Sequence, residues 1–131
     1  MAPFMRRYGN ETYALLRIVT GLLFLCHGAS KLFGFPVPPP AEAPAFVIYA
    51  AGSIELIGGA LVAAGLFTRW AAFFCSGLMA SAYWMAHGTN ALFPLANGGE
   101  LAALYCFVFL FIAAHGSGIW SADGSRGEPA A

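Results

Sequence analysis

Five ionisable side chains lie inside or at the ends of long apolar runs, where such residues are uncommon. Histidine and lysine can donate hydrogen bonds or positive charge to a ligand, and a carboxylate or an imidazole can accept and release protons. A charge at the centre of a bilayer-spanning helix costs at least about 2.5–3.5 kcal/mol, so each of these groups should have a polar partner. We therefore treat them as candidates for a pocket: His27, Lys31, Glu55, His87 and Glu100.

Less specific roles remain open for three of these residues. A structural hydrogen bond is the more frequent role for a histidine such as His27, and a histidine at a helix end, such as His87, needs only solvent. These two histidines could ligate haem from two helices, but nothing beyond their shared depth supports a haem site. Asn97-Gly98-Gly99-Glu100 has the spacing of a capping box, in which Asn97 caps a helix and Glu100 stands at its third position.

The elements that position these residues follow from composition. The chain has 131 residues, of which 60% are hydrophobic and 9% are charged. Apolar runs at about 13–33, 44–67, 70–86 and 99–114 each approach the ~20 residues that cross a bilayer. A soluble bundle would need a polar stripe on every helix, and the second and fourth runs have none. We predict one all-α domain, an integral membrane four-helix bundle, with a mobile tail over 121–131.

The basic residues predict how the bundle is oriented. Four arginines fall on one side of an even-numbered bundle, and Lys31 is the only basic residue near the other side; the four are Arg6, Arg7, Arg69 and Arg126. The positive-inside rule then places both termini in the cytoplasm and the two longer loops outside. We expect Asn10 and Thr68 to cap the first and third helices. Four of the candidates, His27, Lys31, His87 and Glu100, converge toward the outer side, and Glu55 lies nearest the middle of its span. The zero net charge and the absence of a basic patch argue against nucleic acid as a partner.

The first span has a polar stripe at helical spacing, and its inner end carries Arg17. The stripe comprises Arg17, Thr20, Gly21, Phe24, His27, Gly28 and Lys31, and the opposite, lipid-compatible face comprises Leu15, Val19, Leu22, Cys26 and Ala29. Glu55 would lie between the depths of Arg17 and His27. We predict a structural Arg17–Glu55 pair, with His27 as the competing partner of Glu55. In the fourth span, the face below Glu100 that is expected to meet a pocket or the core includes Leu104, Phe107 and Phe111.

Two further patterns concern the halves of the chain and its cysteines. The segment from His27 to Phe33 is echoed from His87 to Phe93, and Gly52–Leu56 is echoed by Asn97–Leu101. These matches indicate either two related helical hairpins or chance similarity. The three cysteines have no CxxC pair and no metal-ligand spacing, so we predict no metal centre; they are Cys26, Cys75 and Cys106.

Several motifs, in this order between Leu15 and Asp123, resemble those of the DoxX family of small four-span membrane proteins. They are Arg17-xxx-Gly21-xx-Phe24-xx-His27-Gly28-xx-Lys31-Leu32, Glu55-Leu56-Ile57-Gly58-Gly59, Gly65-Leu66-Phe67-Thr68-Arg69, Phe93-Pro94 with Asn97-Gly98-Gly99-Glu100-Leu101, and the closing segment from Gly116 to Asp123. The resemblance implies a multi-pass protein of the bacterial inner membrane, associated with quinone-linked sulfur oxidation or with membrane oxidoreductase complexes. It implies no agreed set of catalytic residues.

Two hypotheses about function follow. In the first, the protein is a redox-linked subunit that binds a quinone or a small sulfur anion in the outward-facing pocket. His27 and Lys31 would supply hydrogen-bond donors or charge, and Glu55, His87 and Glu100 would supply a proton route. No haem, flavin or iron–sulfur signature is present, so electrons would come from a bound cofactor or a partner redox protein. In the second, it is a non-enzymatic scaffold, assembly factor or small-solute carrier in the lipid bilayer. A second copy of the chain is the alternative partner to a redox protein.

Overall fold

The computed structural model describes residues 4–126, and this part of the chain is helical, without a strand. Each of the four apolar runs contains one long helix, and three short helices lie outside the runs. The elements are η1 (Arg6–Tyr8), α1 (Gly9–Phe33), α2 (Ala45–Ala64), α3 (Thr68–Ala86), α4 (Pro94–Asn97), α5 (Glu100–His115) and α6 (Ala122–Ser125). The all-helical prediction is therefore confirmed.

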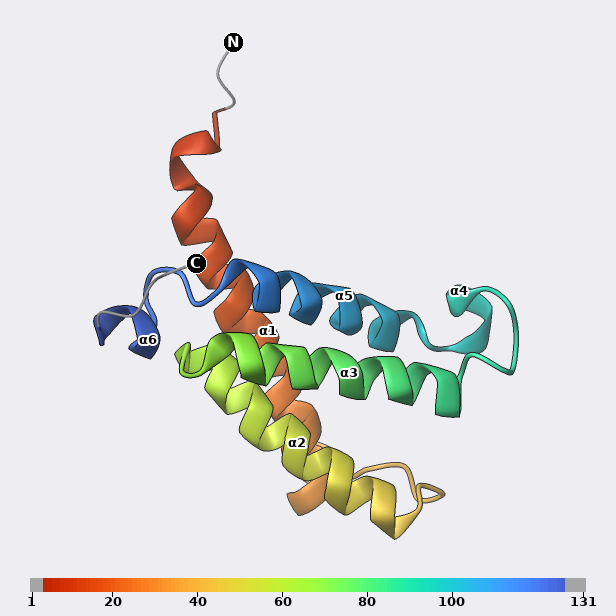
Figure 1. Ribbon diagram of the computed structural model, residues 1–131. Helices are drawn as coiled ribbons and strands as arrows, with labels where there is room; N and C mark the ends of the chain where they lie inside the picture. Colours follow the sequence, from red (N-terminus) through yellow and green to blue (C-terminus); the bar gives the residue numbers. More distant parts are fainter. Residues whose placement is uncertain (1–3, 127–131) are drawn as a thin grey trace.

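The long helices pack as two antiparallel hairpins, α1 with α2 and α3 with α5 (Figure 1). The hairpins cross steeply, whereas a classical four-helix bundle has nearly parallel axes. They meet near the α2–α3 turn and diverge toward the segments 34–44 and 87–99, each of which connects the two helices of one hairpin. The two hairpins do not place their glutamates equivalently, because Glu55 lies in the middle of α2 and Glu100 begins α5.

Two helical segments of the described chain are long and apolar enough to cross a membrane, as judged by length and composition. These segments are Arg6–Phe33, which includes α1, and Ala45–Ala64, which is α2. α5 is apolar but shorter, at 16 residues. The first hairpin is thus the part of the fold with the clearest membrane character.

Glycines bring the backbones of α1 and α2 into direct contact. Gly21 and Gly28 on α1 face Gly59 and Gly52 on α2, with a spacing of seven residues on each helix. A methyl group added at Gly28 would lie 2.7 Å from the carbonyl oxygen of Gly52, and one added at Gly59 would lie 2.7 Å from that of Gly21. The backbones of the two helices are therefore in contact, with no side chain between them.

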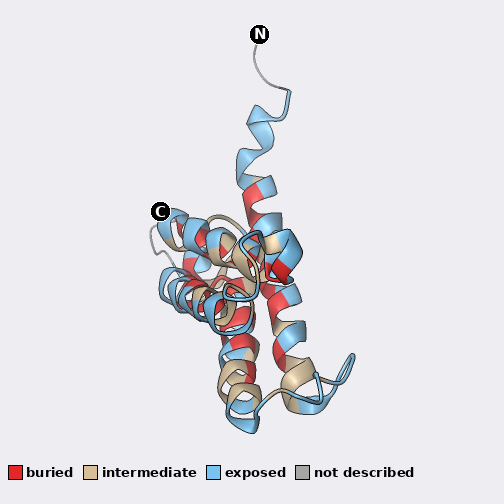
Figure 2. Cartoon of the chain, turned by 90° about the vertical axis from the view of Figure 1, so that its right-hand side faces the viewer, coloured by how far each residue is buried: buried red, intermediate tan, exposed pale blue. Residues whose placement is uncertain are grey.

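The predicted stripe of α1 is mostly the buried face of the helix (Figure 2). Its buried members are Arg17, Thr20, Gly21, Phe24 and Gly28, whereas Leu15, Val19, Leu22 and Cys26 on the opposite face are exposed. Phe24 packs against Tyr105 and Phe109 of the second hairpin, with ring centroids 5.2 and 4.7 Å apart. In α5 the expected face is wrong: Tyr105, Phe109 and Ile112 are buried, and Leu104, Phe107 and Phe111 are exposed.

The segment after α5 folds back onto the first hairpin and forms what we call the C-terminal latch, residues 116–123. Asp123 is 6% exposed, and its carboxylate accepts hydrogen bonds from the amides of Phe67 and Thr68 at 3.0 and 3.2 Å. Asp123 thus caps α3 from a distant part of the chain, whereas the sequence predicts Thr68 itself as the cap. Residues 121–126, expected to be mobile, include α6; residues 127–131 lie outside the described part.

The start of α1 also differs from the prediction. η1 leads directly into α1, whose first residue is Gly9, so Asn10 lies inside the first turn and does not cap the helix. The Tyr13 hydroxyl donates to the carbonyl of Gly116 in the C-terminal latch. This contact joins the beginning of the first hairpin to the end of the second.

Candidate functional site

A hollow of about 440 Å³ lies where the two hairpins diverge, and we call it the central hollow. All four long helices contribute to its wall, the segment 34–44 adds Pro40, and the segment 87–99 adds His87 and Gly98. Most of the lining is apolar. The residues that matter for its chemistry are Phe24, His27, Lys31, Glu55, His87 and Tyr105.

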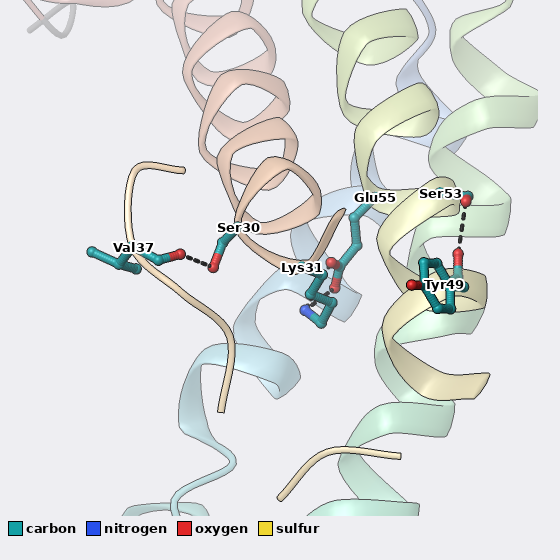
Figure 3. A network of polar contacts seen from close by, with 6 residues as sticks. All are labelled: Ser30, Lys31, Val37, Tyr49, Ser53 and Glu55. Atoms are coloured by element: carbon teal, nitrogen blue, oxygen red, sulfur yellow. Dashed lines mark hydrogen bonds and ion pairs between the residues drawn. The ribbon is translucent and has the colours of Figure 1, made fainter. Parts of the chain in front are cut away.

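An ion pair between Lys31 and Glu55 lies in the wall of the central hollow (Figure 3). The Lys31 Nζ atom is 2.8 Å from Oε2 and 3.0 Å from Oε1 of Glu55, so the ammonium group contacts both carboxylate oxygens. The Glu55 side chain is 4% exposed and that of Lys31 is 22% exposed. The carboxylate is therefore buried with its counter-charge, while the ammonium group lies nearer to the opening.

The glycine contacts between α1 and α2 position this ion pair. A methyl group at Gly52 would lie 3.0 Å from the Cβ atom of Lys31, so Gly52 lets the base of the lysine side chain pass close to α2. The segment after α1 is fastened as well, because the Ser30 hydroxyl donates to the carbonyl of Val37 at 2.6 Å (Figure 3). Both contacts restrict the last turn of α1, from which Lys31 extends.

The predicted Arg17–Glu55 pair is wrong. Arg17 is fully buried, and its guanidinium group donates to the carbonyls of Val62 and Ala63 at the end of α2 and to those of Ile119 and Trp120 in the C-terminal latch. The N···O distances range from 2.7 to 3.4 Å. Four backbone oxygens thus replace the expected carboxylate. This is possible because α2 ends beside Arg17, and the last carbonyls of a helix have no intrahelical donors.

The two histidines both line the central hollow, but they are held differently. His27 packs edge-to-face on Tyr105, with ring centroids 5.9 Å apart, and forms no hydrogen bond with another residue of the range 4–126. His87 follows α3, and its Nδ1 atom is 3.1 Å from the carbonyl oxygen of Asn97. Because a carbonyl only accepts, Nδ1 carries the proton of this contact, and Nε2 is the acceptor in the neutral ring.

Glu100 does not line the central hollow and is exposed. The capping box is also wrong, because Asn97 ends α4 and α5 begins only at Glu100. Instead, Asn97 fastens the segment between α3 and α5: its side-chain amide donates to the Tyr83 hydroxyl at 2.9 Å, and its oxygen accepts from the Gly99 amide at 2.7 Å. Of the five candidates, the fold brings together His27, Lys31, Glu55 and His87.

Tyr105 is the residue of the central hollow that the sequence did not indicate. It is 7% exposed and lies between Phe24, His27 and Phe109, with its ring stacked on that of Phe109. Its hydroxyl adds a donor and acceptor to a wall that is otherwise mostly apolar. Near the hollow, and throughout residues 4–126, no three His, Cys, Asp or Glu side chains gather closely enough to hold a metal ion.

The site is therefore an apolar hollow with one neutralised ion pair, two imidazoles and a phenol, in a small helical protein with membrane-length helices. The chain belongs to the DoxX family, whose model matches residues 12–88. This range contains α2, α3 and all but the first three residues of α1, and with them both members of the ion pair and both histidines of the hollow.

Two curated proteins are similar to the chain. An uncharacterized protein of Haemophilus influenzae is 40% identical over 125 residues, which cover 91% of this chain and 93% of that protein. A protein of Bacillus subtilis named putative oxidoreductase CatD is 44% identical over 59 residues, which cover 42% of this chain and 44% of that protein. No solved structure matches the chain.

Proposed function

We propose that the protein is a multi-pass protein of the bacterial inner membrane, and that its central hollow binds the head ring of a quinone as part of a redox-linked complex. The observation that carries the proposal is the buried Lys31–Glu55 pair in the wall of an otherwise apolar hollow of about 440 Å³. Small-molecule sites typically combine an apolar wall with a few converging polar groups. The name of the B. subtilis relative, a putative oxidoreductase, supports a redox role.

The polar groups suit a quinone ring better than a small sulfur anion. An anion would need net positive charge, and Glu55 already neutralises Lys31 at 2.8 Å. A quinone carries two carbonyl oxygens, which need hydrogen-bond donors. The Lys31 ammonium group has three N–H donors, and His27 has no hydrogen bond to another described residue, so both can donate to a carbonyl of the ring.

Proton transfer would be the chemical contribution of this chain. Reduction of a quinone to a quinol takes up two electrons and two protons, and the electrons would come from a partner redox protein. Glu55 holds a carboxylate beside the hollow, and His27 and His87 add two imidazoles. A carboxylate and imidazoles at the same cavity can pass protons to the ring oxygens as these become basic on reduction.

The proposal includes the arrangement in the membrane. In the proposed N-in/C-in topology, the four long helices lie in the bilayer and the segments 34–44 and 87–99 face outward. Both segments supply a residue to the central hollow, which would therefore open toward the outer side. The arginine distribution supports this orientation, because Arg6, Arg7, Arg69 and Arg126 lie away from those two segments in the sequence.

The test uses the full chain purified in detergent. We expect a quinone in its organic-solvent extract and a rise in Tm when a quinone analogue is added. Lys31→Met combined with Glu55→Gln should abolish the Tm rise, and Glu100→Gln, which changes an exposed carboxylate outside the hollow, should leave it unchanged. An extract without quinone, together with a Tm that no analogue alters, would contradict the proposal.

A second candidate function is a non-enzymatic scaffold, assembly factor or small-solute carrier. The same ion pair favours this function, because Lys31 and Glu55 join α1 to α2 and would then serve only to hold the two helices together. Under this reading the two single substitutions impair folding and the double substitution restores it, with no ligand involved. A double variant that folds as the wild type does and loses the quinone response would rule this reading out.

A further inference from the structure

A second hollow runs along the outside of the molecule between α2 and α3, and we call it the α2–α3 groove. It consists of two adjoining depressions of about 240 and 390 Å³, both lined by Ile54 and Phe74. Only α2 and α3 contribute to its walls. The exposed side chains of Ile54, Phe73 and Phe74 border it, so it lies on a surface that would face lipid in the proposed arrangement.

The groove adjoins the central hollow. The half-buried Leu78 lines both hollows. On α2 the neighbouring residues Ile54 and Glu55 line the groove and the central hollow, respectively. A molecule with a polar head in the central hollow could therefore continue into the groove by passing Leu78.

The lining of the groove is predominantly apolar. The hydroxyl groups of its two serines already donate hydrogen bonds within their own helices. Ser53 donates to the carbonyl of Tyr49 at 2.6 Å (Figure 3), and Ser81 donates to that of Gly77 at 3.0 Å. No charged residue lines the groove. An occupant thus gains contacts through dispersion alone, which suits an aliphatic chain.

Gly77 keeps the groove deep at some cost to α3. A glycine inside a helix is about 1 kcal/mol less favourable than alanine. At Gly28 and Gly59 the close approach of the two helices explains the glycine, whereas a methyl group at Gly77 would meet no atom within 4 Å. The fold itself therefore does not require a glycine here, and the space it leaves lies in the groove.

We propose that the α2–α3 groove binds the hydrocarbon tail of a prenylated quinone whose head ring lies in the central hollow. This inference rests on the proposed function and specifies it: the ligand is a tailed, lipid-soluble quinone. The tail passes Leu78 and leaves the protein between α2 and α3, where it is in contact with the acyl chains of the bilayer. Head and tail are then recognised by different residues.

Two probes with the same quinone head ring test this inference, one with a ten-carbon tail and one with a methyl group in its place. Their affinities for the purified protein are measured in detergent by quenching of tryptophan fluorescence. The variant is Gly77→Leu, whose Cβ meets no atom and whose side chain fills the groove; Ser81→Leu is a second variant at the same wall. Gly9→Leu is the matched control, because its Cβ is equally unhindered and lies in the first turn of α1.

For the wild type and Gly9→Leu we expect the tailed probe to bind about tenfold more tightly than the methyl probe, because the tail adds dispersion contacts. Gly77→Leu and Ser81→Leu should remove this advantage and leave the methyl probe unchanged. Equal affinity of both probes for the wild type would overturn the tail site while leaving the proposed function intact. If neither probe binds the wild type, the proposed function fails.

Two other outcomes would assign the groove to a different occupant and would overturn the inference. A second copy of the chain is indicated if Gly77→Leu converts a dimer into a monomer in size-exclusion chromatography with light scattering. A structural lipid is indicated if a single-chain phospholipid displaces the tailed probe but not the methyl probe and co-purifies with the wild type and not with Gly77→Leu.

Discussion

Replacing Gly28 by alanine tests whether the contact between α1 and α2 is as close as the structure has it. The added methyl group would lie 2.7 Å from the carbonyl oxygen of Gly52 and 2.8 Å from the Cα atom of Leu56, and both are backbone atoms. Bringing the second distance to an ordinary contact of 3.4 Å requires the helices to separate by at least roughly 0.6 Å, because the backbone nitrogen of Leu56 lies closer still to the added methyl group. The contact then loses packing along its length, because Gly21, Gly52 and Gly59 belong to the same interface.

Gly77→Ala is the matched variant, because both positions lie inside long helices and only Gly28 is crowded. Alanine is favoured over glycine by about 1 kcal/mol in either helix, so this contribution cancels in the comparison. Overpacking costs typically about 1–3 kcal/mol. We therefore expect Gly77→Ala to be more stable than the wild type and Gly28→Ala to be less stable than Gly77→Ala by roughly 1–3 kcal/mol.

The measurement is reversible unfolding in mixed micelles, with the fraction of sodium dodecyl sulfate increased and the helix content followed by circular dichroism. The free energy of unfolding is compared among the wild type, Gly28→Ala and Gly77→Ala. Equal stability of the two variants would refute the reasoning, because it would mean that α1 and α2 are further apart than the structure has them. A loss of stability in Gly77→Ala would show that this position is also packed against a neighbour.

Three further predictions use the same unfolding assay. Asp123→Ala should lower the free energy of unfolding by about 1–2 kcal/mol, because the amides of Thr68 and the residue before it lose their cap. Asp123→Asn should lower it less, since one acceptor oxygen remains, and equal losses in the two variants would argue against capping. Arg17→Lys should lower the free energy of unfolding by about 2 kcal/mol, because one ammonium group cannot replace a guanidinium group that donates to four carbonyls on two segments. An unchanged free energy of unfolding would contradict this prediction. Lys31→Met should lower the free energy of unfolding by about 3–5 kcal/mol, because Glu55 is left buried without its counter-charge. Combining it with Glu55→Gln should recover most of this loss, and a double variant as unstable as Lys31→Met would show that the broken ion pair does not cause the loss.

The arrangement of α1 could be predicted from the sequence because its polar residues recur at helical spacing against an apolar background. The burial of Arg17, Thr20 and Phe24 follows directly from that contrast. α5 offers no such contrast, since it is apolar on every side, and the face chosen for it was wrong. Tyr105 was missed for the same reason: nothing in a uniformly apolar helix distinguishes the one aromatic ring that reaches the central hollow.

Charge pairing was predictable only in part. The sequence indicates that Glu55 needs a cationic partner and favours Arg17, with His27 as the competitor. That Lys31 is the partner instead depends on where α2 begins and how its axis crosses α1. Arg17 instead binds backbone carbonyls, which every residue has and which no pattern of side chains marks. The role of Asp123 depends on the chain returning to the α2–α3 turn, a long-range contact that local spacing does not reveal.

The C-terminal latch gives the protein an order of assembly during synthesis. The carbonyls of Ile119 and Trp120 and the carboxylate of Asp123 are made after all four long helices. Until they emerge from the ribosome, Arg17 lacks two of its four acceptors and the first turn of α3 lacks its cap. A chain that stops after α5 would thus contain every long helix and still lack the hydrogen bonds that the C-terminal latch makes to Arg17 and to the first turn of α3. Locking of the first hairpin therefore waits until the C-terminal latch has been synthesised.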